Sequence, residues 1–348
     1  MSYQITRRRP EHDGELFALY ADVFGGRMLE RSRARWQWQY VDNPNTPDDG
    51  PVIWIAVEEG RILGQMATMP FPMWWGGREV RASAGMDYFV RKDAQGRGLG
   101  IALSEAWAAD VNVALALGLT PSSYPLFRKI FTDVGPVPAY LKVLDAGAVA
   151  RRRWGRVAGG AAGALIGLGL SVFARRAAPA PGLEVREVSA FSDEYDDLWR
   201  RARASLATAV RRDAKYLAWK YLRCPFHDYR VLEARSRGAL SGYAVVRPEG
   251  EASFRRGVMA DLFADAGDAA TQDALIDAAL DRFRGQAFAR AETYSMNATL
   301  GAAFRRHGFR RGRTGVQYCV AYRHASDEPL SRTADWHLVL GDGDLDRA

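Results

Sequence analysis

The sequence predicts an α/β (α+β) fold made of two related domains, and three observations carry this prediction. The chain has 348 residues, whereas a domain usually contains about 100 to 200 residues, so two domains are expected. Runs with the alternation of a β-strand are interleaved with runs that have the period of a helix, which is typical of layered α/β folds. Several short patterns of the first half also recur in the second half in the same order, which indicates a duplicated domain.

The recurring patterns identify the repeat. Trp-x-Tyr-x-x-x-Pro occurs at Trp38–Pro44 and again at Trp219–Pro225. Each copy is followed by a strand-like run and then by a short polar turn with glycine, which is the signal of a β-hairpin. If the Trp and Tyr of each copy lie on an extended segment, they share a face and could line an acceptor pocket; the alternative is a packed aromatic core. The strand-like runs cover residues 52–57 and 229–234, and a third match joins residues 126–129 to residues 303–306.

The other elements keep the same order in both halves. Each half begins with an amphipathic helix and continues through the hairpin to a third strand and a second helix. The pair Trp74 and Trp75 precedes two glycines and predicts a hairpin rim, which either contacts substrate or lipid or turns one ring inward. The expected helices cover residues 15–24, 98–112, 192–207 and 271–283, and the third strands cover 86–90 and 258–263.

These elements predict an N-terminal domain over residues 1–145, a linker over 146–183, a C-terminal domain over 184–325 and an acidic tail over 326–348. Within the linker, residues 157–174 carry no charged side chain. A transmembrane helix needs about 20 apolar residues, so this segment is at the short limit. A packed linker helix, a membrane span and peripheral contact with an acidic membrane surface all remain open. The tail is expected to be solvated or docked on a basic surface.

Composition and charge limit the function classes. The formal net charge is +7, which suits anionic partners such as nucleotide phosphates. Cys224 and Cys319 lie in no Cys-x-x-Cys or Cys/His spacing, so neither a disulfide framework nor a metal site is expected. No basic helix with interleaved aromatic residues occurs, so nucleic acid is not an expected partner. The charged N-terminus does not resemble a secretory signal, so we expect a cytoplasmic protein, with membrane association depending on the linker. The oligomeric state is not set by these features.

The chemistry is predicted to lie in a glycine-rich loop of the first half. Glycines let backbone N–H groups approach a ligand closely, and the positive end of the helix dipole favours an anion. Arg91, Lys92 and Arg97 add positive charge, so a phosphate group is the expected ligand. The loop and the first residues of the helix that follows it are Gln95, Gly96, Arg97, Gly98, Leu99, Gly100 and Ile101.

Two common phosphate loops are excluded by the residues present. A P-loop ends in Gly-Lys-Ser/Thr, whereas Gly100 is followed by Ile101. The Rossmann pattern Gly-x-Gly-x-x-Gly would need a glycine at Ile101 or at Leu103. A third pattern, Gln/Arg-x-x-Gly-x-Gly/Ala, fits fully with Gln95, Gly98 and Gly100.

This third pattern resembles the pyrophosphate loop of the GNAT acetyltransferases. A second GNAT pattern, Asn-x-x-Ala-x-x-x-Phe/Tyr-x-x-x-Gly-Phe, is nearly complete from Asn297 to Phe309, with Leu300 in place of the alanine. Residues 121–131 match the same pattern less completely. The resemblance covers most of both predicted domains and looks most like the tandem architecture of mycothiol synthase and the Fem-type peptidyltransferases. It implies two GNAT-like domains, each with a mixed, mostly antiparallel twisted sheet flanked by helices.

The resemblance implies an N-acyltransferase in which an amine directly attacks the thioester of acetyl-CoA or another acyl-CoA. The strand edge at Phe89 and Val90 would bind the pantetheine, and a backbone N–H there would stabilise the oxyanion. Asp87 is the candidate proton acceptor, with an ordered water, or a purely structural role for Asp87, as alternatives. In GNAT proteins a tyrosine often protonates the leaving thiolate, but its position holds Phe127. Tyr124 would share the same helical face and could replace it, or be a packed core residue.

The acceptor is expected to be a primary amine of a small molecule, an amino sugar or glycan, or a peptide. In the second half, residues 264–270 place acids where a pyrophosphate would sit, so only the first domain is expected to bind acyl-CoA. Two other functions remain open. One is aminoacyl or long-acyl transfer from a tRNA or carrier protein, and the other is a non-catalytic acyl-CoA-binding scaffold, which Phe127 and Phe304 favour.

Overall fold

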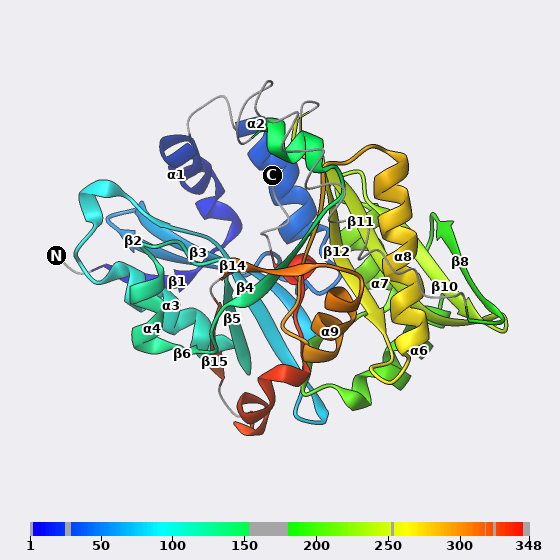
Figure 1. The fold of residues 1–348 in the computed structure, drawn as a ribbon. Coiled ribbons are helices and arrows are strands. Elements are labelled where there is room, and N and C mark those ends of the chain that lie inside the picture. The colour runs from blue at the N-terminus through cyan, green and yellow to red at the C-terminus, as the bar shows by residue number, and fades with distance from the viewer. Residues whose placement is uncertain are drawn as a thin grey trace. The chain divides into compact units, whose positions relative to one another are not determined.

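The computed structural model describes residues 3–24, 29–152, 180–251, 254–316, 318–322 and 325–343. The chain forms two compact units (Figure 1). Unit 1 comprises residues 1–135, 223–225 and 317–330, and unit 2 comprises residues 136–222, 226–316 and 331–348. The apolar segment 157–174 lies outside the described residues, so the predictions made for it stay predictions.

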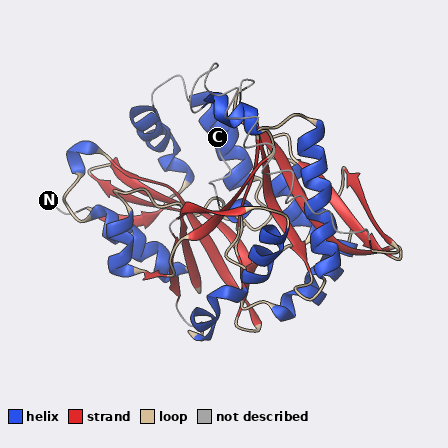
Figure 2. Cartoon of the chain, in the orientation of Figure 1, coloured by secondary structure: helices blue, strands red, loops and turns tan. Residues whose placement is uncertain are grey.

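Unit 1 is built on a mixed sheet, and along the strand order given below the described strands pair antiparallel except at the parallel pair β4–β5. Helices α1 (Asp13–Phe24) and α2 (Leu29–Trp36) lie on one side of the sheet, and α3 (Leu99–Asp110) and α4 (Tyr124–Ile130) lie on the other (Figures 1 and 2). The strand order is β1 (Gln4–Arg7), β2 (Ile53–Glu58), β3 (Arg61–Trp75), β4 (Arg78–Val90), β5 (Val113–Leu117), β15 (Tyr318–Tyr322) and β6 (Thr132–Asp133).

Unit 2 repeats this arrangement, and among its described strands a parallel pair, β12–β13, lies at the equivalent place between antiparallel neighbours. The strand order is β8 (Leu183–Val188), β10 (Arg230–Ser236), β11 (Ala239–Glu249), β12 (Arg256–Ala264), β13 (Arg290–Tyr294), β7 (Val137–Val143) and β14 (Arg310–Val316). Its α-helices include α6 (Glu194–Ala202), α7 (Ala214–Leu217), α8 (Ala269–Gly285) and α9 (Ala298–Arg306), and a parallel pair joins β9 (Thr208–Val210) to β16 (Trp336–His337). The matching strand orders confirm the two mixed sheets flanked by helices.

Each sheet takes its sixth strand from the other half of the chain. In unit 1, β15 lies between β5 and β6, and in unit 2, β7 lies between β13 and β14. The predicted domains, 1–145 and 184–325, are contiguous along the chain, whereas the compact units are interleaved. Each strand is held in its sheet by backbone hydrogen bonds, which are the same for all residue types. The sequence of a strand therefore does not show which of two related sheets the strand joins.

The repeated Trp-x-Tyr pattern forms one turn of π-helix in each unit, η3 (Gln37–Val41) and η6 (Ala218–Leu222). The extended conformation considered from the sequence is therefore wrong for both copies. Residues two apart do not share a face on a helix, so the Trp and Tyr of one copy cannot line a pocket side by side. Trp219 is completely buried and the two tyrosines are almost so, which identifies the pattern as part of each core.

The two tryptophans at the end of β3 point in different directions. Trp75 is completely buried and its Nε1 donates to the backbone oxygen of Ser326 at 2.6 Å, whereas Trp74 is half-buried. Gly76 and Gly77 follow with φ angles of +56° and +84°, which glycine adopts without strain. The interpretation in which one ring packs inward is the one that the structure confirms.

Residues 336–343 of the predicted acidic tail are packed rather than solvated. Trp336, Leu338 and Val339 are buried, and the carboxylate of Asp342 pairs with Arg212 within unit 2. No helix within the described ranges is long and apolar enough to span a membrane. The described residues also contain no cluster of three or more His, Cys, Asp or Glu side chains that could hold a metal ion.

Candidate functional site

The glycine-rich loop leads into an open helix N-terminus in unit 1. Gly96 and Gly98 have φ angles of +80° and +81°, a conformation that side chains disfavour. Gly98 is the N-cap of α3, no side chain caps this helix end, and no acid occupies the first turn. The first N–H groups of a helix have no partner inside the helix. A Cβ at Gly96 would meet no atom within 4 Å, and one at Gly98 only the Tyr3 hydroxyl at 3.9 Å, so the space above the loop is open.

The third glycine of the loop has a different role. A Cβ at Gly100 would overlap the hydroxyl oxygen of Tyr88 on β4. The missing side chain therefore lets α3 approach β4 closely, and the Tyr88 ring packs edge-on against Phe127 of α4 at a centroid distance of 5.6 Å. The glycine pattern thus combines two open backbone positions with one packing position.

Two of the basic residues around the loop, Arg91 and Arg97, form ion pairs. Arg97 makes two hydrogen bonds to the carboxylate of Glu58, at 2.6 and 3.0 Å, and this pair lowers the pKa of Glu58. Arg91 contacts Glu15 and Asp22 and donates to the backbone oxygen of Ile62. The Gln95 side chain donates to the backbone oxygen of Val90 at 3.3 Å, which ties the loop to the end of β4. The Glu58 partner had no signal in the sequence.

Strands β4 and β5 diverge beside the loop. They pair in parallel only from Ala82 opposite Val113 to Ala84 opposite Leu115, although β4 continues to Val90. On its other side β4 stays paired with β3 up to Val90, through a register shift that lies opposite residues 65–67. The β5-facing edge beyond Ala84, which includes Phe89 and Val90, is thus left for another backbone-like group to pair with.

Asp87 lies at this register shift with a φ angle of +42°. Its side chain is only 5% exposed and forms an ion pair with Arg35 of α2. Tyr40 of η3 and Tyr20 of α1 donate to the same carboxylate at 2.7 and 3.1 Å. Burial and the charge of Asp87 raise the pKa of Tyr20 well above its usual value, so this phenol stays a donor. Sequence reasoning selected Asp87 but missed these partners, of which only Tyr40 lies in a repeated motif.

Tyr124 and Phe127 lie on the opposite side of the sheet from the Asp87 partners. Phe127 is buried among Trp107, Tyr88 and Phe131, so no proton donor stands at its position. The half-buried Tyr124 at the start of α4 donates a hydrogen bond to Asp133, and this bond raises the pKa of Tyr124. Both predicted catalytic residues are therefore in unit 1, but they approach the sheet from different faces.

The equivalent helix start in unit 2 is closed by acids. The carboxylate of Asp268 accepts hydrogen bonds from the backbone N–H and the hydroxyl of Thr271, at 3.0 and 2.6 Å, and so caps α8. Asp265 accepts from the N–H of Gly267 at 2.9 Å. A carboxylate thus takes the donors that an anionic ligand would need.

A second buried carboxylate, Asp261 on β12, is the counterpart of Asp87. Tyr221 and Tyr243 each donate to it at 3.1 Å, and Arg212 does so at 3.2 Å. Arg212 also bonds the tail carboxylate of Asp342 at 2.8 and 3.0 Å. Burial alone would raise the pKa of Asp261, but Arg212 together with His337 and Tyr243 lowers it to about 2.

His337 makes the stability of unit 2 dependent on pH. Burial and the nearby Arg212 charge lower the pKa of His337, whose Nε2 lies 3.4 Å from Asp261. An unfolded histidine has a pKa of about 6.5, so below that value the unfolded chain binds a proton that the folded one does not. The His337 contribution is therefore complete above about pH 6.5 and decreases as the pH falls through that value.

We expect His337→Gln, which keeps an N–H donor, to flatten this dependence. Between pH 6.5 and 5.5 the wild-type unfolding free energy should fall by up to about 1.4 kcal/mol more than that of the variant, the limit for one proton. The raised pKa of Asp342 acts in the opposite direction but is present in both proteins. Urea unfolding at several pH values measures the difference, and equal slopes would show that His337 does not titrate on unfolding.

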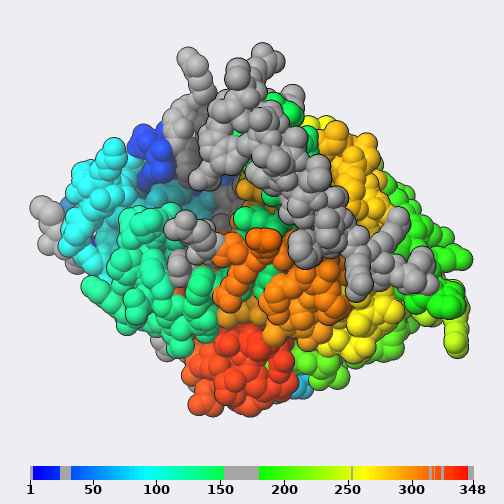
Figure 3. Space-filling model, in the orientation of Figure 1, coloured from blue at the N-terminus to red at the C-terminus, as the bar shows by residue number. Residues whose placement is uncertain are grey.

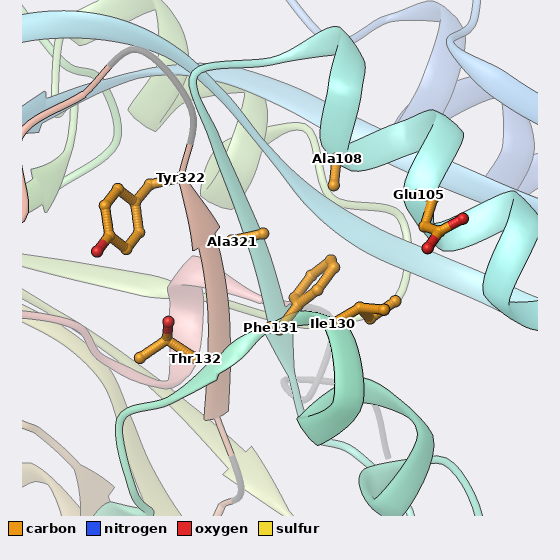
Figure 4. Close-up of a pocket in the computed structure, with 7 residues that line it drawn as sticks. All are labelled: Glu105, Ala108, Ile130, Phe131, Thr132, Ala321 and Tyr322. Carbon is orange, nitrogen blue, oxygen red and sulfur yellow. The ribbon is translucent and has the colours of Figure 1, made fainter.

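Unit 1 contains a cavity that is separate from the glycine-rich loop. It has a volume of about 450 Å³ and lies between α3, the end of α4 and β15 (Figure 4). Its lining includes Glu105, Phe131 and Tyr322 and none of residues 95–101. The outer faces of α3 and α4 form part of the visible surface of unit 1 (Figure 3). The cavity is therefore not the predicted acyl-CoA site.

No family model matches the sequence, and no curated protein matches it. Several solved structures do share its fold. A GCN5-related N-acetyltransferase from Anabaena variabilis is 13% identical with a TM-score of 0.64, covering 92% of this chain and 72% of that chain. A conserved protein of unknown function from Enterococcus faecalis, a probable N-acyltransferase, is 12% identical with a TM-score of 0.63, covering 92% of this chain and 73% of that chain.

A third similar structure is the N-myristoyltransferase of Saccharomyces cerevisiae with bound myristoyl-CoA. It is 12% identical with a TM-score of 0.55, covering 93% of this chain and 84% of that chain. At identities this low, the structural similarity shows the fold alone. The matched part of this chain includes both sheets. The chain therefore has the fold of the GCN5-related N-acetyltransferases, with the same strand order formed twice.

Proposed function

We propose that this protein is an acyl-CoA-dependent N-acyltransferase whose acyl-CoA site lies in unit 1. The observation that carries the proposal is the uncapped start of α3, with Gly96 and Gly98 in left-handed conformations beside the divergent ends of β4 and β5. An anionic diphosphate fits such a helix end because it accepts the free N–H groups. The fold of the similar transferases supports the same class of ligand.

Different residues of unit 1 would have different roles in the reaction. The N–H groups of residues 98–101 would hold the diphosphate, and the open edge of β4 at Phe89 and Val90 would hold the pantetheine amides by strand-like hydrogen bonds. A backbone N–H of the same edge would stabilise the oxyanion that forms when a neutral amine attacks the thioester. The amine loses one proton and the thiolate of CoA gains one. Tyr124 is the candidate donor, and Asp87 or an ordered water is the candidate acceptor.

We propose acetyl-CoA as the first donor to test and a primary amine of a small molecule, an amino sugar or a peptide as the acceptor. Unit 2 would not bind a second acyl-CoA, because Asp268 caps α8. It would instead contribute to the selection of the acceptor or to the stability of the chain.

The test is calorimetric titration with acetyl-, octanoyl- and myristoyl-CoA, followed by a thiol-release assay with a panel of amines. Binding at micromolar concentration of at least one donor, with amine-dependent release of free CoA, is the expected result. If no acyl-CoA binds, the proposal fails, and aminoacyl-tRNA and acyl carrier protein become the donors to examine.

A non-catalytic acyl-CoA-binding scaffold is the second candidate, because Phe127 is buried at the position where a tyrosine would donate a proton. The same experiment separates the two functions. A scaffold binds an acyl-CoA but releases no CoA above the uncatalysed rate with any amine. A catalytic Tyr124 predicts instead that Tyr124→Phe lowers turnover without lowering the affinity for acyl-CoA.

A further inference from the structure

The two units contain the same carboxylate-centred cluster at the same place in the sheet. Asp87 and Asp261 each begin an Asp-x-Phe sequence near the end of the fourth strand of their sheet. The phenylalanines, Phe89 and Phe263, pair with residues that directly follow a glycine. At both glycines, Gly64 and Gly242, a Cβ would lie 2.9 Å from the carbonyl oxygen of that phenylalanine. The two sites therefore share these contacts, although Asp261 stays paired with Val245 in its ladder and Asp87 lies within the register shift of the β3–β4 ladder.

Both clusters hold an irregular strand against helical elements. The β3–β4 ladder shifts register between residues 65 and 67, and the β11–β12 ladder shifts between residues 245 and 246. An irregularity of this kind bends a strand and leaves a residue out of the ladder, so something else must fix its position. The Trp-x-Tyr tyrosines, Tyr40 and Tyr221, donate to the aspartate in each unit, and an arginine pairs with it.

In unit 1 the cluster also holds the backbone of the bulge. The Gln65 side chain donates to the carbonyl oxygen of Asp87 and to the hydroxyl of Tyr20, both at 2.9 Å. Asp87 is thus attached through its side chain to α1, α2 and η3 and through its backbone to β3. Its φ of +42° is one that Asp tolerates better than most residues, but it still needs support from its surroundings.

Unit 2 acts as an internal comparison. Its helix start is capped by Asp268, yet its cluster is complete and its aspartate is only 1% exposed. A carboxylate sealed in this way has no access to a substrate amine. The cluster is therefore present where no acyl transfer is expected, which separates its structural role from catalysis.

We propose that Asp87 is a positioning residue that fixes the bulged end of β4, and not the proton acceptor of the reaction. This inference rests on the proposed function, because the groups that it positions are the backbone N–H groups of residues 88–90 at the acyl-CoA edge. The Arg35 ion pair and the two tyrosine donors occupy both carboxylate oxygens of Asp87, so its side chain is held in these structural contacts. An ordered water is then the proton acceptor.

The test compares Asp87→Asn with Asp261→Asn in the full chain, using amide hydrogen exchange and acetyl-CoA titration. Asp87→Asn removes the charge but keeps an acceptor oxygen. We expect its amides at residues 86–90 to exchange about 10-fold faster and its acetyl-CoA affinity to fall about 10-fold. Asp261→Asn should speed exchange at residues 258–264 and leave the affinity within about 2-fold. Asp87→Glu keeps the charge but should also bind acetyl-CoA more weakly than the wild type, since the longer side chain misplaces the carboxylate.

A proton acceptor predicts a different pattern. Asp87→Asn would then bind acetyl-CoA like the wild type and keep its amide protection, while turnover at saturating donor falls about 100-fold or more and its acidic pH limb disappears. That result overturns the proposal. If Asp87→Asn does not fold, Tyr40→Phe removes one donor and leaves the charge. Faster amide exchange at residues 86–90 in Tyr40→Phe supports the positioning role of Asp87, and unchanged exchange contradicts it. Tyr221→Phe, the equivalent substitution in unit 2, is the matched control.

The two proposals can fail separately. If wild-type protein binds no acyl-CoA, the proposed function fails, but amide exchange still decides whether Asp87 holds β4. If acyl-CoA binds and exchange at residues 86–90 is unchanged in Asp87→Asn and Tyr40→Phe, only the positioning role fails.

Discussion

Gly98→Glu should lower the affinity for acyl-CoA by about 100-fold or more. The substitution forces a side chain into a φ of +81° and places a carboxylate at the uncapped start of α3. Hydrogen bonds to a charged group are worth roughly 1.5–3 kcal/mol each, so losing two of them at this helix end is enough for the expected effect. The new charge also repels the diphosphate. Calorimetric titration with the donor that binds wild-type protein best gives the measurement.

The matched control for this variant is Gly77→Glu. Gly77 has a similar φ of +84° and, like Gly96, has no atom within 4 Å of the position that a Cβ would take, but it lies in the β3–β4 hairpin. Both substitutions add the same charge and a comparable backbone strain, so they should lower the melting temperature similarly. Only Gly98→Glu should lose acyl-CoA binding. Equal affinities in the two variants would place the ligand away from the start of α3.

Arg212→Met should destabilise unit 2 by about 3–5 kcal/mol, the cost typical of breaking a buried ion pair. Arg212 is 1% exposed and is shared by Asp261 and Asp342, which are 1% and 3% exposed. Removing the guanidinium leaves two buried carboxylates without their positive partner, which neither water nor another charge can replace easily. Urea unfolding followed by circular dichroism measures the loss.

Two further variants test this explanation. Arg230→Met removes an exposed pair with Asp228 in the same unit and should change the unfolding free energy by less than about 1 kcal/mol. Adding Asp342→Asn to Arg212→Met removes one unpaired carboxylate and should recover part of the stability. An Arg212→Met protein as stable as the wild type would mean that the network contributes specificity of packing and little net stability.

The local features of the candidate site could be predicted from the sequence because they depend on neighbouring residues. The glycine at position 98 gives the left-handed N-cap of α3, and Asn297 caps α9 by accepting from the N–H of Leu300 at 3.0 Å. The hairpin glycines Gly60 and Gly238 have φ angles of +79° and +86°. Helix α3 covers residues 99–110, close to the expected 98–112.

The local conformation of the repeated Trp-x-Tyr motif could not be predicted from the sequence. Aromatic residues two apart fit an extended strand by pattern alone, yet both copies form a π-helical turn that delivers a tyrosine to a buried aspartate. The partner residues lie 47 and 40 positions away along the chain. Propensity describes a segment in isolation, and here tertiary hydrogen bonds decide its conformation.

The sequence by itself determined the duplicated order of strands and helices and the glycine loop, since these follow from short-range periodicity and from the conformational freedom of glycine. Only the tertiary structure decided which sheet accepts β7 and β15, and which donors surround Asp87 and Asp261. The physical reason is that strand pairing uses backbone groups common to all residues, and that Arg212 meets Asp342 across 130 positions of chain. Such contacts form only when the whole fold brings them together.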